Sequence, residues 1–155
     1  MPHLSLNTAV GPLTLFEEDD AIVALEWGRA PEGEETPLLT KARDQVLDYF
    51  DRKLTQWDLP LNPRGDAFQR AVWDAMCRIP FGSVRTYGEI ARDLSSAARA
   101  VGGACGRNPI PIIIPCHRVI GANGRLTGYS GGAGLETKRA LLFLEGYYAD
   151  ELPLH

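Results

Sequence analysis

The segment from Ile110 to Val119, IPIIIPCHRV, constrains the fold more than any other part of the chain. Its branched apolar side chains need to be buried, and its prolines restrict the backbone to extended or turn conformations. We therefore predict a short buried strand over residues 109–114. Cys116 and His117 follow directly, so this rigid segment would fix a thiol beside an imidazole.

Two interpretations of Cys116 are open at this point. A lone cysteine is most often a buried structural residue. A cysteine with a nearby base or positive charge can instead become a thiolate, which is the nucleophilic form. His3 and His155 lie near the termini, so His117 is the histidine that a fold would hold in place. Because side chains of adjacent residues rarely face each other, His117 would act on the thiol through a water molecule.

Cysteine usage and apolar run lengths exclude several classes of protein. The three cysteines, Cys77, Cys105 and Cys116, are too few for a disulfide framework. No apolar run approaches the ~20 residues that span a bilayer, and the N-terminal residues do not resemble a signal peptide. CxxC and HxxxH spacings are absent, so we expect no metal and no cofactor. These features favour a cytoplasmic protein without a membrane partner.

A stretch with two prolines and a glycine, residues 55–66, divides the 155-residue chain, whose length suits one domain or two small ones. Before it, residues 4–28 alternate between polar and apolar side chains, which predicts a short antiparallel meander. Apolar residues recur at helical spacing over residues 37–54. We predict an N-terminal α/β domain with its linker over residues 1–64 and a second domain over residues 65–155.

The second domain carries mainly helical patterns. Thr86 and Glu89 have the spacing of a capping box, and two short helices joined by a tight turn resemble a helix-turn-helix. Asn123-Gly124 is typical of a short β-hairpin. The predicted fold class is therefore α+β, with a small antiparallel sheet and helix followed by a mainly helical domain. The helices predicted in this second domain span residues 67–79, 86–94, 97–108 and 135–148.

Charge is distributed unevenly along the chain. The net charge is −4, and residues 1–64 hold 12 acidic and 6 basic side chains. Residues 76–134 hold only two acidic side chains against seven arginines, a balance of +5. A local basic field can bind phosphate even on an acidic protein, and arginine suits such contacts well. A solvated arginine-rich face is the alternative.

The predicted helix over residues 97–108, AARAVGGACGRN, is almost without long side chains. Glycine costs about 1 kcal/mol per position in a helix interior, so the adjacent Gly102 and Gly103 need a reason. Close packing against another helix is one reason. Close approach of the backbone to a bulky ligand, such as a groove of duplex DNA, is the other.

Taken together, these motifs resemble the O6-alkylguanine-DNA alkyltransferase family. The resemblance rests on PCHRVIGANGRLTGYSGG, ARAVGGACGRNPIPIII, FQRAVWDAMCRIPFGSVRTYGEIA and KRALLFLEG, and it runs from about Phe68 to Gly146. It implies a monomeric DNA-repair enzyme that transfers an alkyl group irreversibly from O6-alkylguanine in double-stranded DNA to its own cysteine. O4-alkylthymine is a further candidate substrate. The family usually has a glycine or proline in the turn between the two short helices, and this chain does not.

The resemblance also implies five catalytic roles. Cys116 would accept the alkyl group, and His117 would be its base through a water molecule. Glu145 would orient His117. Asn108 would brace the turn near the thiol, and Tyr87 would donate a proton to the departing guanine.

By the same resemblance the helix over residues 97–108 enters the minor groove, with Arg99 filling the gap left by the flipped base. Small residues permit that approach, and a base must leave the stack before a thiolate can reach it. The remaining residues expected to contact DNA are Ala98, Gly102, Gly103 and Arg118. The residues expected to border the guanine pocket are Pro111, the Val119 backbone, Tyr129 and Ser130.

Two other functions fit parts of the sequence. A DNA-binding regulator would use the helix-turn-helix alone and would not need Cys116. A cysteine hydrolase of the Cys-His class would turn over repeatedly and ignore DNA, but the sequence offers no obvious oxyanion donors for it. Cys116 is not replaced by tryptophan, which separates the chain from the non-enzymatic alkyltransferase-like proteins.

Overall fold

The computed structural model describes residues 1–129 and 131–147. The chain separates into two compact units, one from Met1 to Arg64 and the other beginning at Gly65. Within the described residues, no helix has the length and apolar character needed to cross a membrane. The α+β character predicted from the sequence is confirmed, and each unit is described below by itself.

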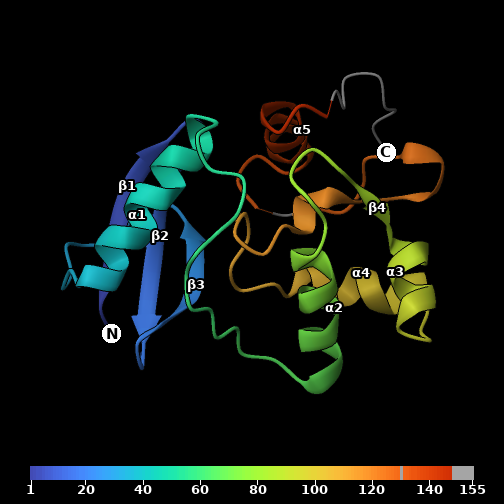
Figure 1. Ribbon diagram of the computed structural model, residues 1–155, viewed down its shortest axis with the longest axis horizontal. Coiled ribbons are helices and arrows are strands. Elements are labelled where there is room, and N and C mark those ends of the chain that lie inside the picture. Colours follow the sequence, from blue (N-terminus) through green and yellow to red (C-terminus); the bar gives the residue numbers. More distant parts are fainter. Residues whose placement is uncertain (130, 148–155) are drawn as a thin grey trace. The chain divides into compact units, whose positions relative to one another are not determined.

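The first unit is built on a three-stranded antiparallel meander in the order β1-β2-β3 (Figure 1). The strands are β1 (His3–Thr8), β2 (Gly11–Glu18) and β3 (Ala21–Trp27). Asp19 and Asp20, between β2 and β3, have φ of 51° and 62°. Two successive left-handed residues match the twist of the flanking strands, so they close a tight hairpin.

Helix α1 (Pro37–Phe50) covers one face of this sheet (Figure 1). The Thr36 hydroxyl caps its first turn by accepting from the Leu39 amide at 3.1 Å, and the proline at the start needs no amide partner. The helix buries Leu39, Ala42, Val46 and Tyr49, all within 1% of full burial, against the apolar side of the strands. This unit has a core of its own.

The second unit begins with two well-capped helices. Asp66 and Gln69 form a capping box at the start of α2, and the box predicted for Thr86 and Glu89 is present at the start of α3. Each box satisfies amides that a helix terminus would otherwise leave unpaired. The helices of this unit are α2 (Ala67–Cys77), α3 (Tyr87–Asp93), α4 (Ala98–Gly106) and α5 (Leu135–Leu144).

Helices α3 and α4 pack together through a short turn made without glycine or proline (Figure 1). Ser95 takes the left-handed conformation, with φ of 52°. Its amide donates to the Arg92 carbonyl at 3.2 Å, and the Ser96 amide donates to the Ala91 carbonyl at 2.8 Å. These two bonds form a Schellman motif, which ends α3 and redirects the chain. Serine thus fills a position where glycine is usual.

Side chains of α2 hold helix α4 in place. The indole N–H of Trp73, on α2, donates to the Ala104 carbonyl at 2.9 Å, and both residues are buried. Ala104 lies in the last turn of α4, and its carbonyl also accepts from the Arg107 amide at 3.2 Å. The Cys105 thiol lies 3.6 Å from the Met76 sulfur beside it. The orientation of α4 therefore depends on side chains of α2.

The strand predicted over residues 109–114 is wrong. Residues 110–114 are buried as expected, but the chain folds into a tight loop in which the Ile114 amide donates to the Ile110 carbonyl at 2.9 Å. Ile112 has φ of 74°, which is rare for a branched side chain and incompatible with a strand. The burial pattern was readable from the sequence, whereas this turn was not.

The predicted β-hairpin at Asn123-Gly124 is also replaced by another arrangement. Both residues have positive φ, 61° and 75°, as such a turn requires. The preceding strand β5 (Val119–Ile120) pairs instead with β4 (Arg85–Thr86), and this two-stranded sheet is parallel. The turn chemistry was correct, but the strand's partner comes from a distant part of the chain.

Candidate active site

Asn108 shapes the loop that carries Cys116. Its side-chain oxygen accepts from the Ile110 amide at 2.9 Å, and its side-chain nitrogen donates to the Ile114 carbonyl at 2.8 Å. These bonds satisfy backbone groups that a neighbouring strand would otherwise satisfy, and they hold Ile112 in its left-handed conformation. The role expected of Asn108, bracing the turn near the thiol, would rest on these two hydrogen bonds.

Cys116 begins a single turn of 3-10 helix, Cys116–Arg118, and its side chain is buried. Burial raises the pKa of the thiol, while Asn108 and Lys138 act in the opposite direction. A buried thiol is a weak nucleophile until it loses its proton. The site therefore needs a base to activate it.

His117 and Glu145 form a fully buried pair. The imidazole Nε2 lies 2.6 Å from Glu145 Oε2, and both side chains are completely covered. Burial alone would raise the pKa of Glu145, but its bonds and charge interactions with His117 and Arg118 outweigh this and lower the pKa to about 2. An ionised carboxylate only accepts hydrogen bonds, so Nε2 is the nitrogen that carries the hydrogen.

The other nitrogen of His117 is the candidate base. Burial lowers the pKa of His117, although Glu145 acts in the opposite direction, so the ring is neutral at pH 7. With the hydrogen on Nε2, Nδ1 presents a lone pair. Nδ1 is buried and has no hydrogen-bond partner within residues 1–129 and 131–147. A buried, neutral acceptor in the residue that follows Cys116 is suited to take up the thiol proton through a water molecule.

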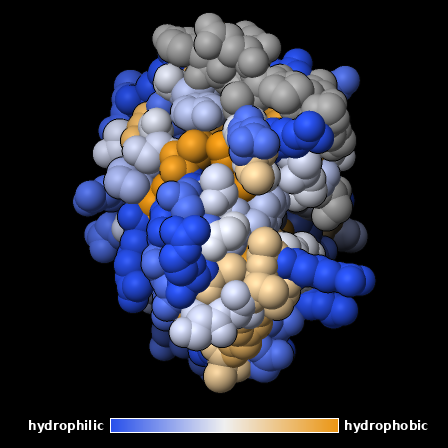
Figure 2. All heavy atoms as spheres, turned by 90° about the vertical axis from the view of Figure 1, so that its right-hand side faces the viewer, coloured by the Kyte–Doolittle hydropathy of each residue, from blue (hydrophilic) through white to orange (hydrophobic). Residues whose placement is uncertain are grey.

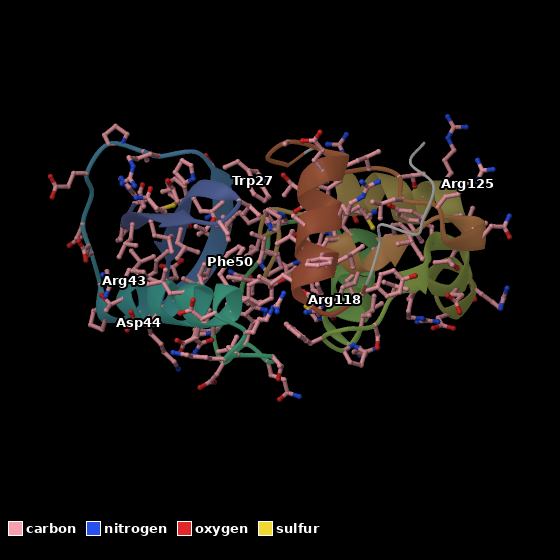
Figure 3. The ribbon with its side chains drawn as sticks, turned by 90° about the horizontal axis from the view of Figure 1, so that it is seen from above. Trp27, Arg43, Asp44, Phe50, Arg118 and Arg125 are labelled. Atoms are coloured by element: carbon pink, nitrogen blue, oxygen red, sulfur yellow. The ribbon has the colours of Figure 1, made fainter. Side chains whose placement is uncertain are left out.

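Arg118 lies in the interior, which does not fit the DNA contact expected of it. Its guanidinium donates to Glu145 Oε1 at 2.8 Å, to Glu145 Oε2 at 3.0 Å and to the Ile79 carbonyl at 2.6 Å. Figure 3 shows Arg118 beside α5, whereas Arg125 extends outward. The sequence suggested a surface charge because arginine is rarely buried without a partner, and it gave no sign that Glu145 is that partner. Arg118 instead fixes the carboxylate that holds His117.

The other residues expected to contact DNA lie on α4 and are largely exposed to solvent. Ala98, Arg99 and Gly103 are exposed and Gly102 is half-buried. A methyl group added at Gly102 or Gly103 would meet nothing within 4 Å. Close packing against another helix therefore does not explain these glycines. Close approach of the backbone to a bulky ligand is the better explanation. On this side of the unit, pale and light-orange residues lie between blue hydrophilic ones (Figure 2).

Of the residues expected to border the guanine pocket, the structure describes Pro111, Val119 and Tyr129. Pro111 is buried and forms a bridge with Ile114, and Val119 is the first residue of β5. Tyr129 is half-buried, and burial raises the pKa of its hydroxyl. Ser130 lies outside the described residues. Within residues 1–129 and 131–147, no group of three or more His, Cys, Asp or Glu side chains is placed to hold a metal ion.

Two family models match the chain over most of its length. One describes the DNA binding domain of 6-O-methylguanine DNA methyltransferase and matches residues 67–147. The other describes the ribonuclease-like domain of the same protein and matches residues 3–63. The chain belongs to the 6-O-methylguanine DNA methyltransferase family. The resemblance seen in the sequence is thereby confirmed.

Relatives of this family member are similar over nearly the whole chain. A methylated-DNA–protein-cysteine methyltransferase of Methanosarcina acetivorans is 41% identical, covering 94% of this chain and 99% of the relative. The constitutive enzyme of the same name from Bacillus subtilis is also 41% identical, covering 92% and 94%. The solved structure of Mycobacterium tuberculosis OGT in complex with DNA is 43% identical, with a TM-score of 0.83 and 96% of each chain covered.

Sequence reasoning missed one buried charge in this member of the 6-O-methylguanine DNA methyltransferase family. Lys138, on α5, has no exposed surface, and its ammonium contacts the Val119 carbonyl and the Tyr87 hydroxyl. Tyr87 also donates to the Thr127 carbonyl at 3.2 Å. Lys138 stands three and four residues before the buried Leu141 and Leu142, so its position on the apolar face of α5 was the available signal.

Proposed function

We propose that this chain repairs double-stranded DNA by transferring the alkyl group of O6-alkylguanine to the sulfur of Cys116. Family membership supports the class of activity. The observation that carries the assignment of residues is the buried His117 imidazole. Its Nε2 is engaged by Glu145, and its Nδ1 is left as an acceptor in the residue that follows Cys116, whose thiol burial keeps protonated.

The transfer begins with loss of the thiol proton. His117 takes this proton through one water molecule, and the Glu145 carboxylate stabilises the resulting imidazolium. The thiolate attacks the alkyl carbon, so that a sulfur–carbon bond forms while the bond from that carbon to O6 breaks. The electron pair of the broken bond stays on the guanine, which takes up a proton supplied by the Tyr87 hydroxyl. Tyr87 then regains a proton from water, and the His117 imidazolium releases the thiol proton to water. Overall, the proton of the thiol is exchanged for the alkyl group, and nothing is oxidised or reduced.

The reaction is a single turnover. The product is a thioether, which is a poor leaving group, and no group in the proposed site could remove the alkyl chain from sulfur. Each protein molecule would therefore repair one lesion. A cysteine hydrolase would instead regenerate its thiol with water, and repeated turnover distinguishes the two functions.

Helix α4 would bring the lesion to the thiol. Its exposed alanine and glycine surface suits close approach to the minor groove, and Arg99 is the long side chain on that surface. A damaged pair costs least to open, and Arg99 would occupy the space of the extruded base. The expected pocket contacts are Pro111, the Val119 backbone and Tyr129.

We also propose that the protein acts as a monomer in the cytoplasm. Cys77, Cys105 and Cys116 are all free thiols, and an acceptor thiol is preserved in a reducing compartment. Sedimentation of the protein, alone and with a short duplex, tests whether it is a monomer in both states. A dimer in either sample would contradict it.

The decisive experiment is intact-protein mass spectrometry after incubation with a duplex that contains O6-methylguanine. We expect a mass increase of one methyl group, which peptide mapping assigns to Cys116, and no further increase with excess substrate. Cys116→Ser is the matched control and should gain nothing. A duplex with O4-methylthymine tests the second candidate substrate. Methyl on Cys77 or Cys105, or repeated turnover, would refute the assignment.

A further inference from the structure

Lys138 is a buried cation that the steps above do not use. Its side chain is fully covered, a rare situation for lysine unless it is paired. The ammonium donates to the Val119 carbonyl at 2.6 Å, to the Thr127 carbonyl at 2.6 Å and to the Tyr87 hydroxyl at 3.4 Å. In the part of the chain that the structure describes, no carboxylate forms an ion pair with it.

The three contacts match the hydrogen-bonding capacity of a charged lysine. An ammonium has three N–H donors and no acceptor, and Lys138 has three oxygen partners. The partners come from three segments: β5, the loop that follows it, and the first residue of α3. Burying a cation is costly unless its donors are satisfied. The charged form therefore ties these three segments to α5.

Two of these partners belong to the proposed reaction. The Val119 backbone is expected to contact the guanine, and the Tyr87 hydroxyl is expected to protonate it. We propose that Lys138 is a positioning residue for the transfer, because it holds the Val119 carbonyl and the Tyr87 hydroxyl in place. This inference rests on the function proposed above.

The electrostatics of the site agree with this geometry. Burial lowers the pKa of Lys138 to about 8, and only the thiolate forms of Cys116 and Cys105 would favour its charged form. Lys138 in turn lowers the pKa of Cys116 against the effect of burial. At neutral pH most molecules carry the ammonium. As the pH rises through about 8, Lys138 loses its charge and one of its three donors.

The ionisable groups that face Lys138 do not titrate in the same way. They are Tyr87 on α3, Cys105 on α4, and Cys116 and His117 in the 3-10 turn. Burial raises the pKa of Tyr87 and both thiols, and it lowers the pKa of His117. More thiolate at higher pH would accelerate transfer. A rate that falls near pH 8 therefore points to Lys138.

The first test is Lys138→Met, which shortens the unbranched side chain by one atom and removes the charge and its donors. At saturating O6-methylguanine duplex we expect the single-turnover rate to fall about 100-fold, the effect typical of losing a preorganised donor. Affinity for undamaged duplex should be unchanged, because a buried lysine cannot reach phosphate. The control is Lys53→Met, an exposed lysine in the first unit, which should match the wild type in both measurements.

The second test is the pH profile of the wild-type transfer rate from about pH 6 to pH 9.5, which reports essential acids and bases. We expect the rate to rise and then fall with a midpoint near 8, and we expect Lys138→Met to lack the falling limb. This profile decides the question even if the variant does not fold. A wild-type rate that rises throughout, or a folded Lys138→Met variant as fast as wild type, would overturn the inference. Failure of the wild type to methylate Cys116 would instead refute the proposed function.

Discussion

Replacing Glu145 with glutamine removes the charge that joins His117 and Arg118 while keeping the shape of the side chain. All three side chains are at least 95% buried. The folded-state pKa of Glu145 is about 2, against an ordinary value of 4.5. At 1.36 kcal/mol per pKa unit, this difference corresponds to roughly 3 kcal/mol of stability at pH 7. Breaking a buried ion pair costs a similar amount, about 3–5 kcal/mol.

The assay is urea unfolding at pH 7 and at lower pH. Because the folded-state pKa of Glu145 lies below the unfolded value, its contribution is fully present at neutral pH and is lost as the pH falls from about 4.5 through about 2. We therefore expect Glu145→Gln to lower the free energy of unfolding by roughly 3 kcal/mol at pH 7. The difference in free energy of unfolding between wild type and variant should become smaller in acid. Glu136→Gln, at an exposed position in the first turn of α5, should lose less than about 1 kcal/mol.

Glu145→Gln also tests the role of His117 as the base. Without the carboxylate, the His117 imidazolium loses its stabilising partner, so we expect transfer to slow by about 100-fold or more. Equal stability of wild type and Glu145→Gln, or a loss that does not narrow in acid, would refute the reasoning about the buried pair. A slow but equally stable variant would separate the catalytic role from the structural one.

Three further results are expected. Arg99→Ala should slow repair of duplex DNA far more than attack on a free O6-substituted guanine base, because flipping costs a few kcal/mol; equal losses on both would assign Arg99 to the fold. Asn108→Ala should cost about 2–4 kcal/mol in urea unfolding by orphaning the Ile110 amide and the Ile114 carbonyl, and Asn108→Asp should restore only the first bond. Duplex affinity should fall steeply with salt and vary little with sequence; affinity equal at low and high salt would count against phosphate contacts.

Predictions that depend only on neighbouring residues agree best with the structure. The capping box at Thr86 and Glu89 and the positive φ at Asn123 and Gly124 are satisfied within a few residues, so no distant contact alters them. The role proposed for Cys116 came from its place between Pro115 and His117, and it stays a prediction. Family resemblance then supplied the roles that spacing alone could not.

Features that depend on distant partners were not predictable. Residues 109–114 have the composition of a strand, but the Asn108 side chain supplies the bonds that another strand would provide. Arg118 was expected to contact DNA, and Lys138 was not singled out in the sequence. Their partners, Glu145 for the first and the Val119 carbonyl for the second, lie 27 and 19 residues away along the chain. Pairing over such separations is set by packing, which a single sequence does not display.

The hydrogen bond between Trp73 and α4 makes the helix visible to spectroscopy. Trp73 is the only tryptophan in the sequence after residue 64, and its indole nitrogen is 2.9 Å from the Ala104 carbonyl. Indole emission depends on the hydrogen bonding and polarity at that nitrogen. With Trp27 and Trp57 replaced by phenylalanine, the intrinsic fluorescence of the protein would report any tilt of α4 in real time. Docking on a duplex and the chemical step could then be timed separately in one unlabelled sample.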